Sequence, residues 1–355
     1  MKRRENHSPL APACPIPPSK GDVIVIGHGS GGRLTADLVG RVFLPALSNP
    51  ILDRLGDSAE LTVGGSRILF TTDSFVVSPL RFPGGDIGSL AVHGTINDLA
   101  VAGGRPIAIS ASFILEEGFP IEEARRIAES MRAAADSAAV AVVAADTKVV
   151  ERGKADGIFV TTSGIALAPE GLELGPERIR KGDAVLVSGP VGDHGIAVMS
   201  AREELEFETA LTSDSAPLNG LVAAMLECGG GAIRCMRDPT RGGAATVLNE
   251  LAKAGGVEIV VEESAVPVRD EVRAACEILG LDPLYVACEG RLVAIVEEPE
   301  AEKVLASMRA HPMGAMAARI GTVMGSGVGR VVLKTPFGTS RLLDVLPGAQ
   351  LPRIC

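Results

Sequence analysis

The chain ends at a thiol. Cys355 is the final residue of the segment Leu351-Pro352-Arg353-Ile354-Cys355. A thiol in this position is slim enough to enter a narrow pocket, accept a group, react there and withdraw. Its own α-carboxylate disfavours the thiolate, because like charges raise a pKa, and Arg353 is the neighbouring cation that could offset this. Position alone favours an idle thiol on a frayed end, so the case for chemistry depends on the remaining sequence.

Four aspartates, Asp57, Asp73, Asp98 and Asp146, lie in or beside apolar stretches of the first half. Isolated carboxylates are unfavourable in such places unless something neutralises them. Mg²⁺ that bridges phosphates does so economically, because it takes a few carboxylates and keeps several waters. Any single one is more often a helix cap or a turn residue. All four together with Lys148 indicate a site for magnesium and a nucleoside triphosphate.

A glycine-rich loop, Gly27–Gly32, follows an apolar run at Val23–Ile26 that predicts a strand, and a predicted helix comes next. Backbone N–H groups at such a helix start suit phosphate, which makes candidates of Gly29, Ser30, Gly31 and Gly32. The loop also fits G-x-G-x-x-G, with Asp53 near the place of a ribose-binding acid, so a dinucleotide oxidoreductase competes. The short, Pro-flanked segment before Asp53 is a poor second strand. A plain turn is the structural alternative.

Composition narrows the class of protein. The chain has 355 residues, 46% of them hydrophobic, so two domains with ample core are expected. A net charge of −10, one Tyr and no Trp argue against nucleic-acid binding. The six cysteines form no CxxC pair, which disfavours zinc and is typical of reduced thiols in the cytoplasm. No apolar run is long enough to predict a membrane span.

Periodicity and turn signals divide the chain into an α/β protein of two domains. Residues 1–20 are predicted to be a disordered extension, 21–170 an N-terminal nucleotide-binding domain, 175–334 a C-terminal α/β domain and 335–355 a mobile tail. Predicted strands lie at 23–26, 67–77, 106–115, 139–145, 157–168, 184–188, 256–262, 284–287, 291–297 and 329–333. Predicted helices lie at 34–47, 88–102, 120–135, 195–204, 217–228, 241–254, 268–279 and 299–309.

Two loops of the second half are open to more than one interpretation. Gly189–Gly195 and Arg237–Gly243 each precede a predicted helix. In the second loop Thr240 or Asp238 could cap the helix from 241, or the loop is a phosphate or substrate lip whose cation is Arg241. Glu289 precedes a predicted strand, where it is either a general base or an ion-pair partner of Arg291.

Together these strings resemble the HypE family, the carbamoyl dehydratases of nickel–iron hydrogenase maturation. The resemblance runs from about residue 24 to residue 355, and its most specific element is the terminal Pro-Arg-Ile-Cys. It rests on Gly27–Gly32, Thr71–Val77, Phe82–Gly88, Gly94–Ala100, Asp146–Val150, Gly189–Gly195, Asp238–Gly243, Glu289–Leu292 and Pro352–Cys355. The family is similar to aminoimidazole ribonucleotide synthetase, so the resemblance implies that α/β (α+β) two-domain fold and an ATP site shared across a homodimer. One departure is Ala144-Ala145, where the family usually has Gly before Asp-Thr-Lys.

The resemblance also implies a reaction. A HypF-type carbamoyltransferase would load the thiol of Cys355, and this chain would use ATP and Mg²⁺ to dehydrate the carbamoyl group to a thiocyanate. A HypC–HypD-type scaffold would then accept the cyanide ligand destined for iron. In this scheme Asn97 and Lys148 contact the γ-phosphate and Glu289 is the base. The metal and phosphates are organised by Asp57, Asp73, Asp98 and Asp146.

Other functions compete with this one. A related phosphotransferase or selenophosphate synthetase would act on a free small molecule; the latter would carry a reactive Gly-Cys-Gly-Cys-Lys-like string, whereas Cys14 lies in Ala-Cys-Pro. A non-enzymatic thiol scaffold would need the tail but not the acids.

Overall fold

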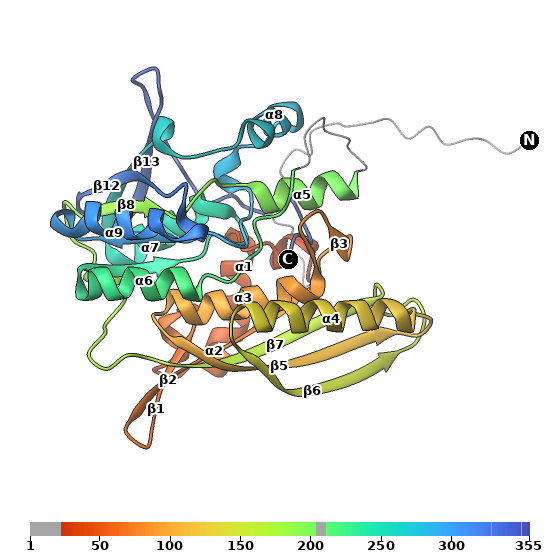
Figure 1. The fold of residues 1–355 in the computed structure, drawn as a ribbon. Helices are drawn as coiled ribbons and strands as arrows, with labels where there is room; N and C mark the ends of the chain where they lie inside the picture. Colours follow the sequence, from red (N-terminus) through yellow and green to blue (C-terminus); the bar gives the residue numbers. More distant parts are fainter. Residues whose placement is uncertain (1–22, 204–210, 328, 349) are drawn as a thin grey trace, which may run out of the picture.

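The computed structural model describes residues 23–203, 211–327, 329–348 and 350–355, which form two large sheets and a two-stranded one, with helices between and around them (Figure 1). The predicted extension at 1–20, with Cys14, lies outside the described residues. Among those described, no helix combines the length and the apolar composition needed to cross a membrane.

The first sheet has the strand order β1-β2-β7-β5-β6 and is antiparallel except for the parallel pair β5–β6. Helices α3 and α4 cover one of its faces (Figure 1). The bounds are β1 Ala59–Val63, β2 Ser66–Phe75, α3 Ile87–Val101, β5 Arg105–Glu116, α4 Ile121–Ser137, β6 Ala141–Val150 and β7 Ile158–Leu167.

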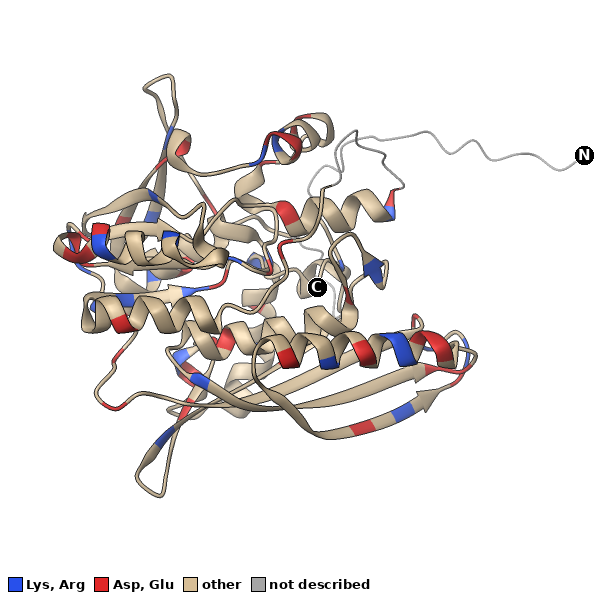
Figure 2. Cartoon of the chain, in the orientation of Figure 1, with Lys and Arg blue, Asp and Glu red and all other residues tan. Residues whose placement is uncertain are grey.

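Helix α3 lies at the centre of the molecule and is buried on nearly every side, because it contacts the first sheet, α4, α6 and β9. Gly88 permits the close crossing with α4, since a Cβ there would lie 2.4 Å from the carbonyl oxygen of Ile127. Helix α4 is instead amphipathic: Ile127 and Met131 are buried, and its outer face carries alternating charges (Figure 2).

The second sheet has the order β14-β13-β10-β12-β8-β11-β9. Its central strand β8 is apolar on both sides, since Val185 and Val187 join the core under α7 while Ala184 and Leu186 join the core under α6 and α9. The bounds are β8 Ala184–Val187, α6 Asn219–Gly229, β9 Ile233–Arg237, α7 Gly243–Gly255, β10 Val257–Glu262, β11 Val293–Val296, α9 Glu298–Ala310, β12 Ala318–Ser326, β13 Arg330–Lys334 and β14 Ser340–Leu342.

The remaining elements border the site. The hairpin β3–β4 and helix α5 lie beside the chain's last residues, and three short helical pieces, α1, η2 and α2, follow the glycine-rich loop (Figure 1). Helix α8 packs in a cluster that includes Leu351. Their bounds are α1 Arg33–Leu38, η2 Val39–Phe43, α2 Leu44–Leu47, β3 Arg81–Phe82, β4 Gly85–Asp86, α5 Asp193–Arg202 and α8 Asp270–Leu279.

Most predicted elements are present, but two predicted strands are wrong. The run Val23–Ile26 pairs with no strand of the described chain and leads into a 3-10 turn at Ile26–Gly29. Residues 284–287 contain a 3-10 turn, Pro283–Tyr285, because Asp282 caps it by accepting from the backbone N–H of Leu284. Six strands were not predicted, namely β1, β3, β4, β9, β12 and β14, the last of which lies within the segment predicted to be a tail.

The central position of α3 predicts where the fold is sensitive. Ile96 on this helix is fully buried, so Ile96→Ala should lower the free energy of unfolding by about 2–5 kcal/mol. The matched control is Ile278→Ala on α8, whose side chain is 79% exposed and which should change stability by no more than about 0.5 kcal/mol. Urea unfolding measures both, and equal effects would contradict the assignment of α3 to the core.

Candidate active site

A cavity between the two sheets is lined by carboxylates from separate elements. Asp57 precedes β1, Asp98 lies on α3 and Asp238 follows β9, and one oxygen of each lies within 4.8 Å of the others. Asp73 of β2 lines the same cavity. The structure thus brings together three of the predicted acids and adds Asp238, whose loop was predicted to be a helix cap or a phosphate lip.

The crowding of these acids is visible in their pKa values. Burial raises the pKa of Asp98 well above its ordinary value, and Asp238, Asp57 and Asp73 raise it further. Burial and then Asp57 raise the pKa of Asp238 to about 8. The Asp57–Arg237 ion pair, 2.9 Å long, lowers the pKa of Asp57, but burial outweighs it and the pKa is raised. Such a set of oxygen ligands has more negative charge than its protein partners neutralise, and it suits a hard divalent cation.

The glycine-rich loop closes one side of this cavity and adjoins a second one. Gly31 lines the acid cavity, while Gly29, Ser30 and Gly32 line the neighbouring cavity that holds the chain's end. Gly31 has a φ of +75°, and a Cβ there would lie 2.7 Å from the Cβ of Arg241, so only glycine fits this approach. At Gly32 a Cβ would lie 2.6 Å from the carbonyl oxygen of Leu346.

Several backbone donors at the end of this loop and at the start of α1 are already occupied in this conformation. The N–H groups of Arg33 and Leu34 donate to the carbonyls of Leu346 and Pro347, and that of Gly31 donates to the Thr35 hydroxyl. The first turn of α1 is therefore capped by the chain's own C-terminal segment.

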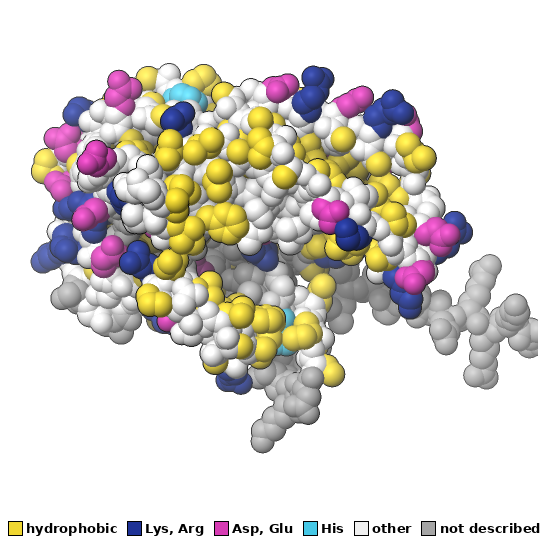
Figure 3. Space-filling model, turned by 90° about the horizontal axis from the view of Figure 1, so that it is seen from below, with side chains coloured by type: hydrophobic (Ala, Val, Ile, Leu, Met, Phe, Trp, Pro, Cys, Tyr) yellow, Lys and Arg dark blue, Asp and Glu magenta, His cyan; other side chains and the backbone are white. Residues whose placement is uncertain are grey.

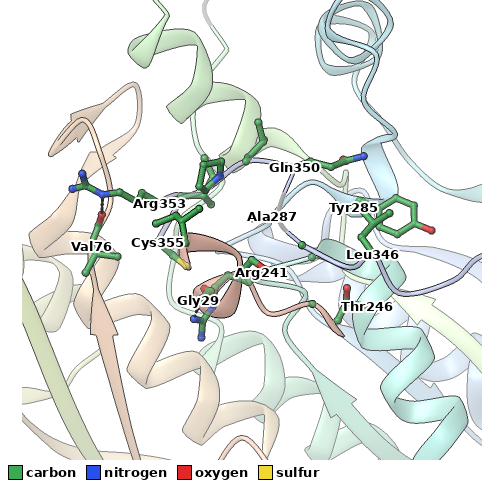
Figure 4. A pocket seen from close by; sticks show the side chains of 18 of the residues that line it. Gly29, Val76, Arg241, Thr246, Tyr285, Ala287, Leu346, Gln350, Arg353 and Cys355 are labelled. Carbon is green, nitrogen blue, oxygen red and sulfur yellow. Dashed lines mark hydrogen bonds between the residues drawn. The ribbon is translucent and has the colours of Figure 1, made fainter. Parts of the chain in front are cut away.

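The C-terminal residues lie in the second cavity, with the thiol of Cys355 turned toward Arg241 (Figure 4). Arg241 lines both cavities and therefore connects the thiol with the acids. Burial raises the pKa of the Cys355 thiol and Glu289 raises it further, while Arg241 lowers it. The cation near the thiol is thus Arg241, whereas Arg353 donates to the carbonyl of Val76 and pairs with Asp156.

Glu289 is deeply buried at 2% exposure, and its Oε1 atom has no hydrogen-bond partner among the described residues. Its pKa is raised well above the ordinary value by burial, and then by Asp238 and Asp73. Asn97, predicted to contact a phosphate, instead donates its side-chain N–H groups to the carbonyls of Glu289 (3.0 Å) and Ala216 (3.1 Å). Asn97 therefore holds the backbone that carries Glu289.

Asp146 and Lys148 are not brought to either cavity of this chain. Both lie on β6, more than 60% exposed, where the ammonium of Lys148 pairs with the carboxylate of Asp146 at 2.7 Å. The ion pair is solvated, and its Lys148 hydrogen bond lowers the pKa of Asp146.

The fold and the site define a class of protein. Residues 56–168 match the AIR synthase related protein N-terminal domain and residues 180–334 match its C-terminal domain. More particularly, the chain belongs to the HypE family of carbamoyl dehydratases, enzymes of hydrogenase maturation. It is 56% identical over 328 residues to carbamoyl dehydratase HypE of Azotobacter vinelandii, covering 92% of this chain and 96% of that protein.

Two solved structures support the same assignment. A HypE–HypF complex matches with a TM-score of 0.83 and 48% identity, covering 87% of this chain and 99% of that chain. HypE in complex with ATP matches with a TM-score of 0.79 and 46% identity, covering 94% of this chain and all of that chain (100%). The resemblance found in the sequence and the predicted two-domain fold are both confirmed.

The raised pKa of Asp238 predicts how the metal-free chain responds to pH. Its carboxyl has a pKa of about 8 when folded and about 4 when unfolded, so between these values the folded state holds more protons. The free energy of unfolding should therefore fall as pH rises from about 6 to about 8, and fall less in Asp238→Asn. Urea unfolding in chelator measures this, with exposed Asp136→Asn as control. Equal slopes in Asp238→Asn and wild type would contradict the prediction.

Proposed function

We propose that this chain uses ATP to dehydrate a carbamoyl group carried on its own Cys355 to a thiocyanate, which supplies cyanide ligands to the iron of nickel–iron hydrogenase. The observation that carries the proposal is the position of the terminal thiol beside Arg241, the residue that also lines the acid cavity. A related phosphotransferase acting on a free small molecule is less favoured, because the chain's own tail lines the cavity where such a substrate would lie.

The proposed reaction assigns a task to each group. The amide oxygen of an S-carbamoyl group is a poor leaving group until it takes the γ-phosphoryl group of ATP. Loss of phosphate and of both N–H protons then leaves S–C≡N. Glu289 is the base that we assign to proton removal, since its carboxylate lies close enough to Cys355 to raise the thiol's pKa and its own pKa is raised. Arg241 would stabilise charge on the transferring phosphoryl group.

Nucleotide and metal are assigned to the acid cavity. A solved structure of a relative that is 46% identical contains ATP, which supports ATP as the second substrate. Mg²⁺ fits the residues present, because Asp57, Asp98 and Asp238 offer oxygens within 4.8 Å of one another and their pKa values are raised. Asp73 is a further candidate ligand on the same wall. When bound, the ion would neutralise the acids and the phosphates.

We also propose a homodimer formed through the first sheet. The face of this sheet away from α3 and α4 carries exposed apolar side chains (Figure 3), and β6 is exposed along nearly its whole length. Val143 is 67% exposed and Phe70 40% exposed, although side chains of this kind are usually buried. A second copy on this face would bring its Asp146 and Lys148 toward the site, which accounts for their distance from it here.

The remaining partners follow from the chemistry. A HypF-type carbamoyltransferase would load Cys355, and a solved HypE–HypF complex of a relative 48% identical supports it. A HypC–HypD-type scaffold is proposed as the acceptor, since a thiocyanate must pass its cyanide on before the thiol can be loaded again. The free thiols at Cys228, Cys235, Cys276, Cys288 and Cys355 support a reducing compartment such as the cytoplasm.

Intact mass after incubation with ATP, carbamoyl phosphate and a HypF-type transferase tests the reaction. The chain should gain one carbamoyl group and then lose water, whereas Cys355→Ala should do neither. Glu289→Gln should be carbamoylated but should lose water about 10²–10⁴-fold more slowly, because the base is gone. Glu277→Gln, on the exposed side of α8, is the matched control. Water loss at the wild-type rate in Glu289→Gln would remove that residue from the mechanism.

The dimer makes a separate prediction. Val143→Glu should convert the dimer to monomer in analytical ultracentrifugation, because it puts a charge into the interface. Ile121→Glu, at an 81% exposed position of α4, should leave the dimer intact. If Lys148 acts on the other copy's site, mixing Lys148→Ala with Glu289→Gln chains should restore activity, since one site of each mixed dimer is complete. No restoration would mean that both residues serve one chain.

A further inference from the structure

The backbone of the last four residues is held at every carbonyl. Two donors are backbone N–H groups that follow β2. That of Val76 donates to the carbonyl of Cys355 (3.1 Å), and that of Ser78 donates to the carbonyl of Arg353 (3.2 Å). Two side chains of α5 supply the other donors. Arg202 donates to the carbonyls of Pro352 (2.8 Å) and Arg353 (2.7 Å), and His194 Nε2 donates to that of Ile354 (2.9 Å).

His194 is fully buried, and its hydrogen bonds fix its protonation. Since Nε2 donates to a carbonyl, Nδ1 must accept, and it does so from the hydroxyl of Ser213 at 2.8 Å. Burial lowers the pKa of His194 to about 4, so the ring is neutral at physiological pH and remains in this tautomer.

Arg202 joins the tail to the body of the protein. Besides its two tail carbonyls, its guanidinium donates to the carbonyl of Ser78 at 2.9 and 2.6 Å. The planar guanidinium reaches these three oxygens at once, which a lysine ammonium cannot do with the same geometry.

The tail's side chains complete the fit. Ile354 is 3% exposed and joins the core cluster that contains Phe82, Val198 and Ala287. Arg353 adopts a left-handed backbone conformation with φ of +53° and turns its guanidinium outward to Asp156. With Ile354 held inward by its side chain and both flanking carbonyls bonded, the thiol of Cys355 is directed toward Arg241.

We propose that Arg202 and His194 are positioning residues of the dehydration. By binding the tail's carbonyls they define a groove for a C-terminal peptide that bends at Arg353, and Ile354 is its apolar anchor. The proposal rests on the proposed function for its consequence in catalysis, but the docking itself is measurable without any turnover.

Alkylation of Cys355 in the full-length chain tests the docking. Iodoacetamide modification is scored by mass spectrometry of the C-terminal peptide, with Cys228 in the same sample as the internal reference. Arg202→Met should raise the Cys355 rate about tenfold, since it removes charge-assisted hydrogen bonds to the tail. The alkylation rate of Cys355 in Arg202→Lys should lie between those of wild type and Arg202→Met, because lysine keeps the charge without the planar geometry. Arg125→Met, at an exposed position of α4, should match wild type.

A tail-side variant excludes damage to the groove as the explanation. Ile354→Ala leaves every groove residue in place and removes only the anchor, so it too should raise alkylation of Cys355. In single turnover at saturating ATP, Arg202→Met and Ile354→Ala should lower the rate of water loss while the dissociation constant for ATP stays unchanged.

The outcomes separate the two proposals. If wild type fails to lose water yet Arg202→Met and Ile354→Ala expose the thiol, the proposed function is wrong and the docking groove stands. If the wild type loses water but Cys355 in both variants is alkylated at the wild-type rate, the positioning roles are overturned. A lower melting temperature with unchanged alkylation also overturns them, because it leaves Arg202 a purely structural role.

Discussion

Mutual repulsion among buried carboxylates is the constraint on which the site depends. Asp57, Asp98 and Asp238 come from three elements and meet within one cavity, where Asp238 and Asp57 raise the pKa of Asp98 and Asp57 also raises that of Asp238. A folded chain tolerates this only when cations compensate. Arg237 does so on one wall, and Arg241 on the other, where its own pKa is raised first by Cys355 and then by Asp73. The same guanidinium that offsets the acids therefore faces the thiol.

Helix α3 fixes the positions of the groups in this arrangement. It carries Asp98 on one turn and Asn97 beside it, and Asn97 binds the carbonyl of Glu289. Two adjacent residues of one buried helix therefore fix both parts of the site: Asp98 is itself a candidate metal ligand, and Asn97 positions the candidate base Glu289. Because the helix contacts both sheets, its place cannot change without repacking both. Substitutions at Gly88, which allows α4 to approach, should therefore disturb chemistry and folding together.

Local pattern was enough to predict α4 and most strands, since their apolar periodicity agrees with their burial. Helix α3 was predicted instead from Gly103-Gly104, which follow its last turn. Local pattern failed where contacts with residues distant in the sequence determine the structure. The strand β9 carries Arg234 and Arg237 among its five residues, so it lacks an apolar run, and missing it hid the place of Asp238 at its end. Val23–Ile26 is apolar but has no strand beside it. The tail groove was beyond prediction, because its donors, Arg202 and His194, bind backbone atoms about 150 residues away, and backbone acceptors leave no signature in sequence.

A tethered substrate changes what the groove must achieve. The segment Asp344–Pro347 is anchored independently, through Arg33 and the hydroxyl of Tyr285, so the last residues never diffuse away. Attachment gives the thiol a high effective concentration at the groove, and modest docking energy is then sufficient to populate the docked state. In the proposed reaction stronger docking would be a disadvantage, because the same thiol would have to leave the groove to be loaded and to pass on its product. A few hydrogen bonds to carbonyls and one isoleucine side chain are consistent with that compromise: they hold the backbone in register and leave the sulfur free to carry different groups.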